Sequence, residues 1–127
     1  MNETLKQLFD RKSVRVFEDR IITEEDKTLI LDAAIQAPTA GNLHLYSILD
    51  ITDPTMKNKL AETCDHQPFI AKAPMVLIFV ADACRLYDGF DLLDQEIHPP
   101  GVGQLLLCIS DALIAAQNAV VAAQSLG

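Results

Sequence analysis

The sequence is short of positive charge. Only 10 lysines and arginines stand against 18 acidic residues, which gives a formal net charge of -8 at pH 7. The sequence pI is about 4.6. Nucleic acids and anionic membranes are bound through an extended positive field, which most of this surface cannot supply. The composition therefore argues against nucleic-acid and membrane binding, and any anion site must be local.

The sequence also lacks the spacings that mark a disulfide framework or a metal site. Its three cysteines, Cys64, Cys84 and Cys108, are odd in number and form no C-x-x-C pair. That pattern is typical of reduced thiols in the cytoplasm. The three histidines show no metal-ligand spacing. We therefore expect a cytoplasmic protein with no disulfide and no metal.

Two further signals are missing. No apolar stretch follows a basic start in residues 1–12, so we expect no secretory signal. Gly101-Val102-Gly103 follows no expected strand and lacks the rest of a dinucleotide-binding fingerprint, so we assign it no cofactor.

The chain has 127 residues, 50% of them hydrophobic, and can bury roughly two-thirds of its unfolded surface. We expect one domain over residues 1–127.

Apolar periodicity and end signals predict the elements. They are, in chain order, a helix over about 2–9, a short strand or extended arm at 13–17, a helix from Thr23 that stops before Pro38, a loop at 38–42, a strand from Leu45, a helix from Asp53 to about Cys64, a strand over 75–80 and a helix over 104–126. The continuous apolar run MVLIFV at 75–80 predicts a strand buried on both faces. The acidic segment 82–96 is expected to be mostly exposed, and residues 98–103 to form a break.

The helix at 104–126 is apolar nearly all round. Asp111 near its middle, with Gln117 and Asn118, argues against a membrane span. Such a helix must instead be buried in a core or against a partner chain, with Gly127 as its C-cap. A buried helix at the end of the chain also suggests that something that covered it is absent. Small residues allow another helix to approach it closely: Ala112, Ala115, Ala116, Ala119, Ala122 and Ala123.

Positive charge gathers in one place. Residues 10–20, DRKSVRVFEDR, hold Arg11, Lys12, Arg15 and Arg20. The guanidinium forks and the Ser13 hydroxyl offer charge-assisted donors to a phosphate. A solvated surface patch is the alternative interpretation.

Two other segments offer polar groups to a ligand. The turn PTAGN at 38–42 has small residues that let backbone approach a ligand, and Asn42 supplies both a donor and an acceptor. A simple helix-stop loop would look the same. Gln67 precedes the apolar run and can also bond in both directions, although a satisfied polar side chain is the ordinary interpretation of a lone amide.

The order of these motifs resembles the nitroreductase superfamily of flavin enzymes. The matching patterns are R-x-S-x-R, A-P-[ST]-A-x-N, Q-x-F-x-x-x-A-P and D-A-x-I-A-A-Q-N, and the resemblance runs from Leu8 to Gly127. It implies an α+β class, with a nitroreductase-like fold in which helices flank a central mixed β-sheet and a long buried helix lies at a dimer interface. It also implies a homodimer whose flavin sites are shared between the two chains.

The resemblance implies FMN as the cofactor and NAD(P)H as the electron donor. Phosphate binding falls to Arg11, Lys12 and Ser13, and Arg15 lies by the flavin ring. The remaining implied contacts are Pro38, Thr39, Ala40, Asn42 and Gln67. Electrons would pass to small flat acceptors such as nitroaromatics and quinones, and because the flavin carries the chemistry no catalytic side chain is expected.

The sequence departs from the family in two ways. His44 and Leu45 stand where many relatives carry Gln-Pro, and relatives continue beyond the long helix with further flavin-covering segments. Two other functions remain open. One is an FMN-binding protein that stores, senses or degrades flavin without nicotinamide turnover, and the other is an acidic interaction domain that uses residues 82–96.

Overall fold

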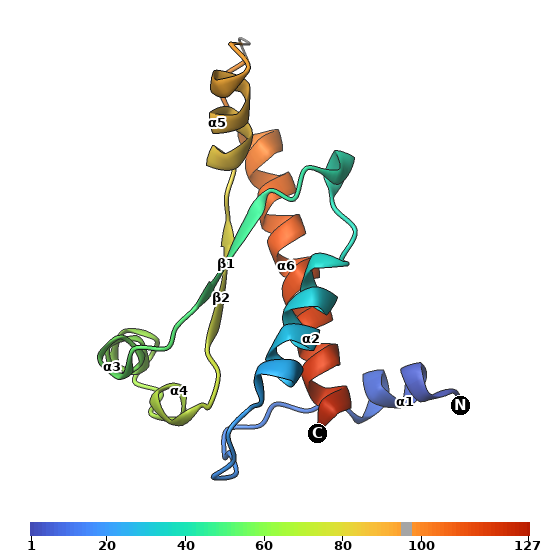
Figure 1. The fold of residues 1–127 in the computed structure, drawn as a ribbon, viewed down its shortest axis with the longest axis vertical. Helices are drawn as coiled ribbons and strands as arrows, with labels where there is room; N and C mark the ends of the chain where they lie inside the picture. The colour runs from blue at the N-terminus through green and yellow to red at the C-terminus, as the bar shows by residue number, and fades with distance from the viewer. Residues whose placement is uncertain (95–97) are drawn as a thin grey trace.

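The computed structural model describes residues 1–94 and 98–127. Its elements are α1 (Glu3–Asp10), α2 (Glu24–Ile35), the 3-10 turn η1 (Ala40–Asn42), β1 (Tyr46–Asp50), α3 (Pro54–Thr63), α4 (Phe69–Lys72), β2 (Leu77–Ala81), α5 (Cys84–Leu92) and α6 (Val102–Leu126). Figure 1 shows α2 and α6 together on one side of the strand pair, with α3 and α4 at one end of the strands and α5 at the other.

Helix boundaries follow from local capping. Thr23 Oγ1 accepts a hydrogen bond from the Asp26 amide at 3.0 Å, and Asp53 caps α3 in the same way through the amides of Thr55 and Met56. Gly127 takes a left-handed φ of 106° at the end of α6, and its amide donates to Gln124. The predicted helix starts at Thr23 and Asp53 and the predicted C-cap at Gly127 are thus confirmed.

The start of α6 differs from the expected one. The helix begins at Val102, two residues before the expected position, because the Gly101 amide donates to Gln104 Oε1 at 3.1 Å and so supports an earlier first turn. Of the acidic segment 82–96, residues 82–94 are exposed or half-buried and contain α5, and the rest lies outside the described residues.

The two strands form an antiparallel pair in which Tyr46 lies opposite Ala81 and Asp50 opposite Leu77. The expected strand at 75–80 was wrong in its start and in its burial, because β2 begins at Leu77 and is half-buried to exposed. The two faces of the pair differ. Ile48 and Phe79 pack on the buried side against α2 and α6, whereas Val80 points away and is exposed. An apolar run alone cannot show that only one face is covered.

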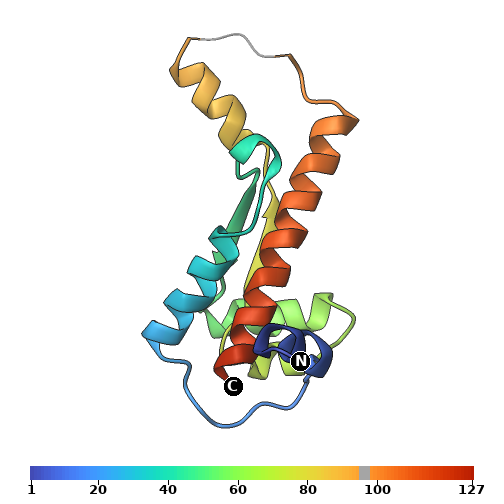
Figure 2. The ribbon, with the colours of Figure 1, turned by 90° about the vertical axis from the view of Figure 1, so that its right-hand side faces the viewer.

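Helix α6 contributes more buried residues to the core than any other described element, and all of them lie on one stripe. Its buried residues are Cys108, Asp111, Ala112, Ala115 and Ala119, a spacing of three and four that places them on one face. This small-residue face lets α2 lie close alongside, as Figure 2 shows. The chain on its own covers only this stripe of α6 and leaves Leu105, Leu106 and Leu113 exposed, in line with the expectation that one domain cannot cover the helix on every side. Among the described residues, α6 is also the one helix whose length and composition would allow it to cross a membrane.

Candidate functional site

The basic segment is an extended arm between α1 and α2, without helix or strand. Its alternating residues find no partner strand, so Val16 is 86% exposed. Arg11, Lys12 and Ser13 are exposed as well, and none of their side chains bonds to the described residues. These donors are available to a ligand, although the chain does not fix their positions.

Arg15 is held more closely than its neighbours. Its guanidinium carbon lies 5.7 Å from the centre of the Phe69 ring at the start of α4, a cation–π contact. Gln67 precedes that helix by two residues, and its side-chain amide donates to the Cys64 carbonyl at 2.9 Å. The structure therefore brings the Arg15 and Gln67 segments together, and Gln67 Oε1 has no partner among the bonds of the described residues.

Arg20 has a different role from the rest of the basic cluster. Its Nη2 donates to the carbonyl oxygen of Gly127 at 2.9 Å, across 107 positions of sequence. A cation is favourable at the negative end of a helix dipole. Arg20 therefore fastens the arm to the end of α6 and is not a free donor for an anion.

The loop after α2 has a defined shape. The Thr39 hydroxyl accepts from the His44 amide at 3.3 Å, and His44 Nε2 lies 3.1 Å from Asn42 Oδ1, where the Nε2–H tautomer donates. Gly41, Asn42 and His44 all have φ between 51° and 57°. Left-handed backbone is uncommon for residues other than glycine and persists where the surroundings hold it. With its oxygen engaged by His44, Asn42 presents its NH₂ group as a donor.

A buried carboxylate on α6 supports this loop. Asp111 is 2% exposed, and its two oxygens accept from the amides of Ala40 at 3.0 Å and Leu45 at 3.3 Å. In the sequence, Asp111 is evidence against a membrane span and the first residue of the D-A-x-I-A-A-Q-N pattern, but neither use assigned it a role in the site. The available signal was an acidic residue within an apolar stripe, since a buried charge requires hydrogen-bond partners.

The Asp111 charge also reaches two neighbours. Burial, and secondly the negative charge of Asp111, raises the pKa of Tyr46, while the Arg85 charge acts to lower it. Burial followed by the same carboxylate raises the pKa of the Cys108 thiol. Both side chains are therefore neutral at physiological pH.

The two halves of the expected site lie apart within one chain. The loop follows the end of α2, whereas the arm precedes its start. A helix of 12 residues spans roughly 18 Å at about 1.5 Å per residue. Figures 1 and 2 show the loop and the arm toward opposite ends of α2. Arg15 and Gln67 are thus brought together, and Asn42 is not brought to them.

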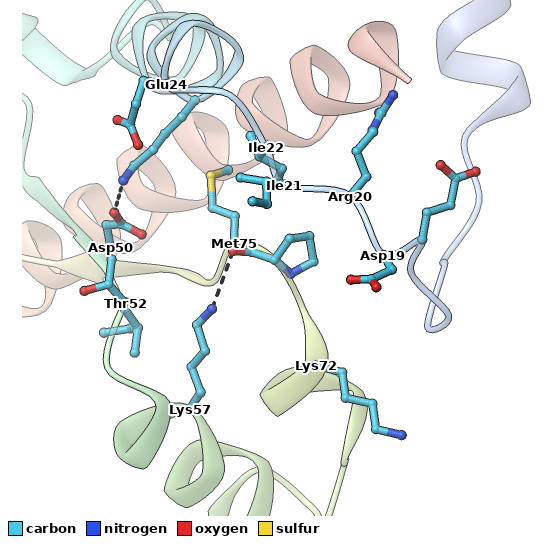
Figure 3. Close-up of a pocket in the computed structure, with 14 residues that line it drawn as sticks. Asp19, Arg20, Ile21, Ile22, Glu24, Asp50, Thr52, Lys57, Lys72 and Met75 are labelled. Carbon is cyan, nitrogen blue, oxygen red and sulfur yellow. Dashed lines mark hydrogen bonds and ion pairs between the residues drawn. The ribbon is translucent and has the colours of Figure 1, made fainter.

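Two open cavities border the arm. The smaller, about 360 Å³, is lined by Arg15, Val16, Phe17, Glu18, Asp19 and Lys72. The larger, about 400 Å³, lies between the arm, α3 and the start of β2 (Figure 3). Three of its cations are engaged. Arg20 bonds to Gly127, Lys27 pairs with Asp50, which raises the pKa of Lys27, and Lys57 donates to the Ala73 carbonyl at 3.0 Å. Among the described residues, no cluster of acidic, cysteine or histidine side chains is arranged to hold a metal ion.

Known proteins share this fold. The solved structure of B. megaterium NfrA2 matches it with a TM-score of 0.95 at 33% identity, covering 100% of this chain and 52% of that one. NADPH:FMN oxidoreductase from Vibrio harveyi complexed with NAD+ matches with a TM-score of 0.90 at 28% identity, covering 99% of this chain and 53% of that one. The implied nitroreductase-like α+β fold is confirmed.

The family follows from the sequence comparison. The model of the Nitroreductase family matches residues 8–127, and the chain belongs to that family. A relative named FMN reductase [NAD(P)H], from Bacillus subtilis strain 168, is 34% identical over 100% of this chain and 52% of its own length. FMN reductase (NADPH) of the same strain is 29% identical with the same coverage. The chain spans about half the length of the curated relatives it matches.

Proposed function

We propose that this chain serves an FMN-dependent oxidoreductase that passes electrons from NAD(P)H to small flat acceptors such as nitroaromatics and quinones. The observation that carries the proposal is the presence of two complementary sets of unpaired donors, on the arm and on the loop after α2. Relatives named FMN reductase and NADPH-flavin oxidoreductase support it.

The donor chemistry fits FMN. Arg11, Lys12 and Ser13 would hold the phosphate, because exposed cations and a hydroxyl without internal partners lose no existing bond when they meet a dianion. Arg15 would stabilise negative charge on the pyrimidine side of the ring. The redox chemistry, hydride acceptance from NAD(P)H and electron delivery to the acceptor, is supplied by FMN when it is bound.

The other half of the site would come from the loop after α2. Small side chains at Pro38, Thr39 and Ala40 allow the backbone to approach the flavin, and the Asn42 NH₂ group would donate to it. Gln67 would accept through its free Oε1. No side-chain acid or nucleophile is assigned, because the residues of this chain bind and orient the cofactor.

A homodimer would join the two halves. Outside its buried stripe, α6 carries an apolar seam at alternating spacings of four and three residues, the repeat of a helix–helix contact. We call this the α6 seam, and it comprises Val102, Leu106, Ile109, Leu113, Ala116 and Val120. Leu106 and Leu113 are 59% and 65% exposed. A second copy packed on the seam would bring the arm of one chain toward the loop of the other.

The residues of the α6 seam differ from the small residues that the sequence predicts at the contact with a second helix. Ala112, Ala115 and Ala119 are buried in the core, and Ala122 and Ala123 pack against the core cluster that Ala119 forms with α2. These five small residues therefore face their own chain, and of the expected set only Ala116 lies on the α6 seam. The composition alone could not show which face of α6 the core occupies.

Flavin loading followed by turnover tests the function. Purified protein incubated with FMN and freed of excess should show a flavin absorption spectrum, and it should oxidise NAD(P)H in the presence of a nitroaromatic or a quinone. Bound flavin without turnover on any acceptor would favour a protein that stores, senses or degrades FMN. A colourless protein that cannot be loaded would contradict both.

The compartment and domain organisation are part of the proposal. We infer a cytoplasmic protein, supported by free thiols at Cys64, Cys84 and Cys108. We also infer that residues 1–127 form a single nitroreductase-like domain that corresponds to the N-terminal portion of the family fold.

A further inference from the structure

Asp111 joins the two ends of a loop that is distant from it in sequence. Its Oδ1 accepts from the Ala40 amide, 71 positions away, and its Oδ2 from the Leu45 amide, 66 positions away. The residues between those two amides include Asn42, which is exposed and has its oxygen engaged by His44. One buried carboxylate therefore holds both ends of the segment that carries the proposed flavin donor.

A carboxylate fits this position for a chemical reason. It offers two acceptor oxygens and no donor, which matches two converging N–H groups. A leucine there would leave both amides without an acceptor, and an asparagine would turn an NH₂ group toward one of them. The loop needs such support because Asn42 and His44 both have left-handed backbone.

The same side chain connects the loop to α6. Asp111 lies in the buried stripe with Ala112 and Ala115, while Leu113 on the α6 seam faces outward. The loop is therefore anchored through Asp111 to the helix that would carry the second copy.

We propose that Asp111 is a positioning residue that fixes the loop from Ala40 to Leu45 in the shape it presents to FMN. The inference rests on the proposed function for its ligand, and on geometry alone for the loop. Asp111 acts through the backbone amides and does not touch the cofactor.

Amide hydrogen exchange in the intact, FMN-free protein tests the loop directly. Asp111→Asn should accelerate hydrogen exchange at the Ala40 or Leu45 amide by about tenfold or more, because that amide loses its hydrogen bond to a charged acceptor. Asn118→Ala is the matched control, since Asn118 Nδ2 also joins α6 to a main-chain carbonyl, that of Ala33 at 3.1 Å. The control should leave exchange at both loop amides unchanged.

FMN titration of the same proteins tests the positioning role. Asp111→Asn should weaken FMN binding by about tenfold and alter the visible spectrum of the bound flavin, and Asn118→Ala should do neither. Unchanged exchange at both amides would overturn the inference, as would accelerated exchange with wild-type FMN affinity. A wild-type protein that binds no FMN would instead reject the proposed function, while the exchange data still decide whether Asp111 holds the loop.

Wild-type exchange keeps the inference testable if Asp111→Asn fails to fold. The Ala40 and Leu45 amides should exchange at least about tenfold more slowly than the Gly41 amide, which has no acceptor among the bonds of the described residues. Equal rates at the three amides would overturn the inference.

Discussion

The loop after α2 and the basic arm offer the same kind of donor, but the chain holds them very differently. The loop is bonded internally through Thr39 and His44 and is fixed at both ends by Asp111. The arm is tied down at Arg15 and Arg20, while its proposed phosphate ligands project freely. The loop therefore has its shape without a ligand, whereas we expect the phosphate-binding side chains of the arm to be positioned by the ligand or by a partner chain.

The largest expected effect comes from breaking the dimer. Leu113→Lys places a charge in the middle of the α6 seam, where it is unfavourable once desolvated. We expect a monomer by analytical ultracentrifugation and the loss of FMN from both sites. Leu113 is well exposed in the single chain, so the variant should stay folded. Met56→Lys, at an exposed apolar position on α3, is the control that should stay dimeric. A Leu113→Lys monomer that retains FMN would show that one chain holds both halves.

The next effect concerns the arm. Arg11→Ala and Ser13→Ala should each weaken FMN binding by about tenfold to a hundredfold, since a hydrogen bond to a charged group contributes about 1.5 to 3 kcal/mol. Urea unfolding without FMN should show the stability of both variants unchanged, because neither side chain bonds to the described residues. Lys59→Ala removes an exposed cation elsewhere and should leave FMN binding intact. Wild-type affinity in both arm variants would refute the phosphate assignment.

Arg15→Ala should have a smaller effect on affinity and a distinct one on the flavin. Removing positive charge near the ring makes the anionic reduced form less favourable, so the reduction potential of the bound flavin should fall. FMN affinity should fall less than in Arg11→Ala. Dye equilibration measures the potential, and an unchanged value would refute the placement of Arg15 by the ring.

The smallest expected effect lies on the loop side, at alkaline pH. The pKa values of Cys108 and Tyr46 are raised above their ordinary values of 9.0 and 10.0. A group with a raised folded-state pKa adds stability below its unfolded pKa and loses it as the pH rises through the folded one. The free energy of unfolding should therefore fall above about pH 9. It should fall less steeply in Asp111→Asn, because that variant lacks the Asp111 charge that helps to raise both pKa values. Urea unfolding across this range checks the slopes, and equal slopes would exclude the Asp111 contribution.

Local features were readable from the sequence, and contacts across the chain were not. Thr23, Asp53 and Gly127 act within one turn of their own helix, so their caps could be predicted from residue type and position. Arg20 was grouped with the other basic residues because nothing near it indicates its bond to Gly127.

The faces of elements were hard to predict for the same reason. The apolar run of β2 and the small residues of α6 indicate burial, but they do not show which neighbour covers which side. Asp111 was visible as an anomaly in an apolar helix, and its partners became known only when Ala40 and Leu45 were placed beside it.

We propose that the arm of one chain and the loop of its partner share a flavin, and a mixed dimer distinguishes this arrangement from a site within one chain. One chain carries Arg11→Ala with Ser13→Ala, the other carries Asn42→Ala, and the two are co-expressed with different tags and purified through both. Isologous symmetry gives such a dimer one doubly damaged site and one intact site. The mixed dimer should contain about half of the wild-type FMN and show about half of the wild-type activity by this two-site count, and both mutant homodimers should bind little FMN. A mixed dimer that binds no more flavin than its parent homodimers would contradict it and place the site within a single chain.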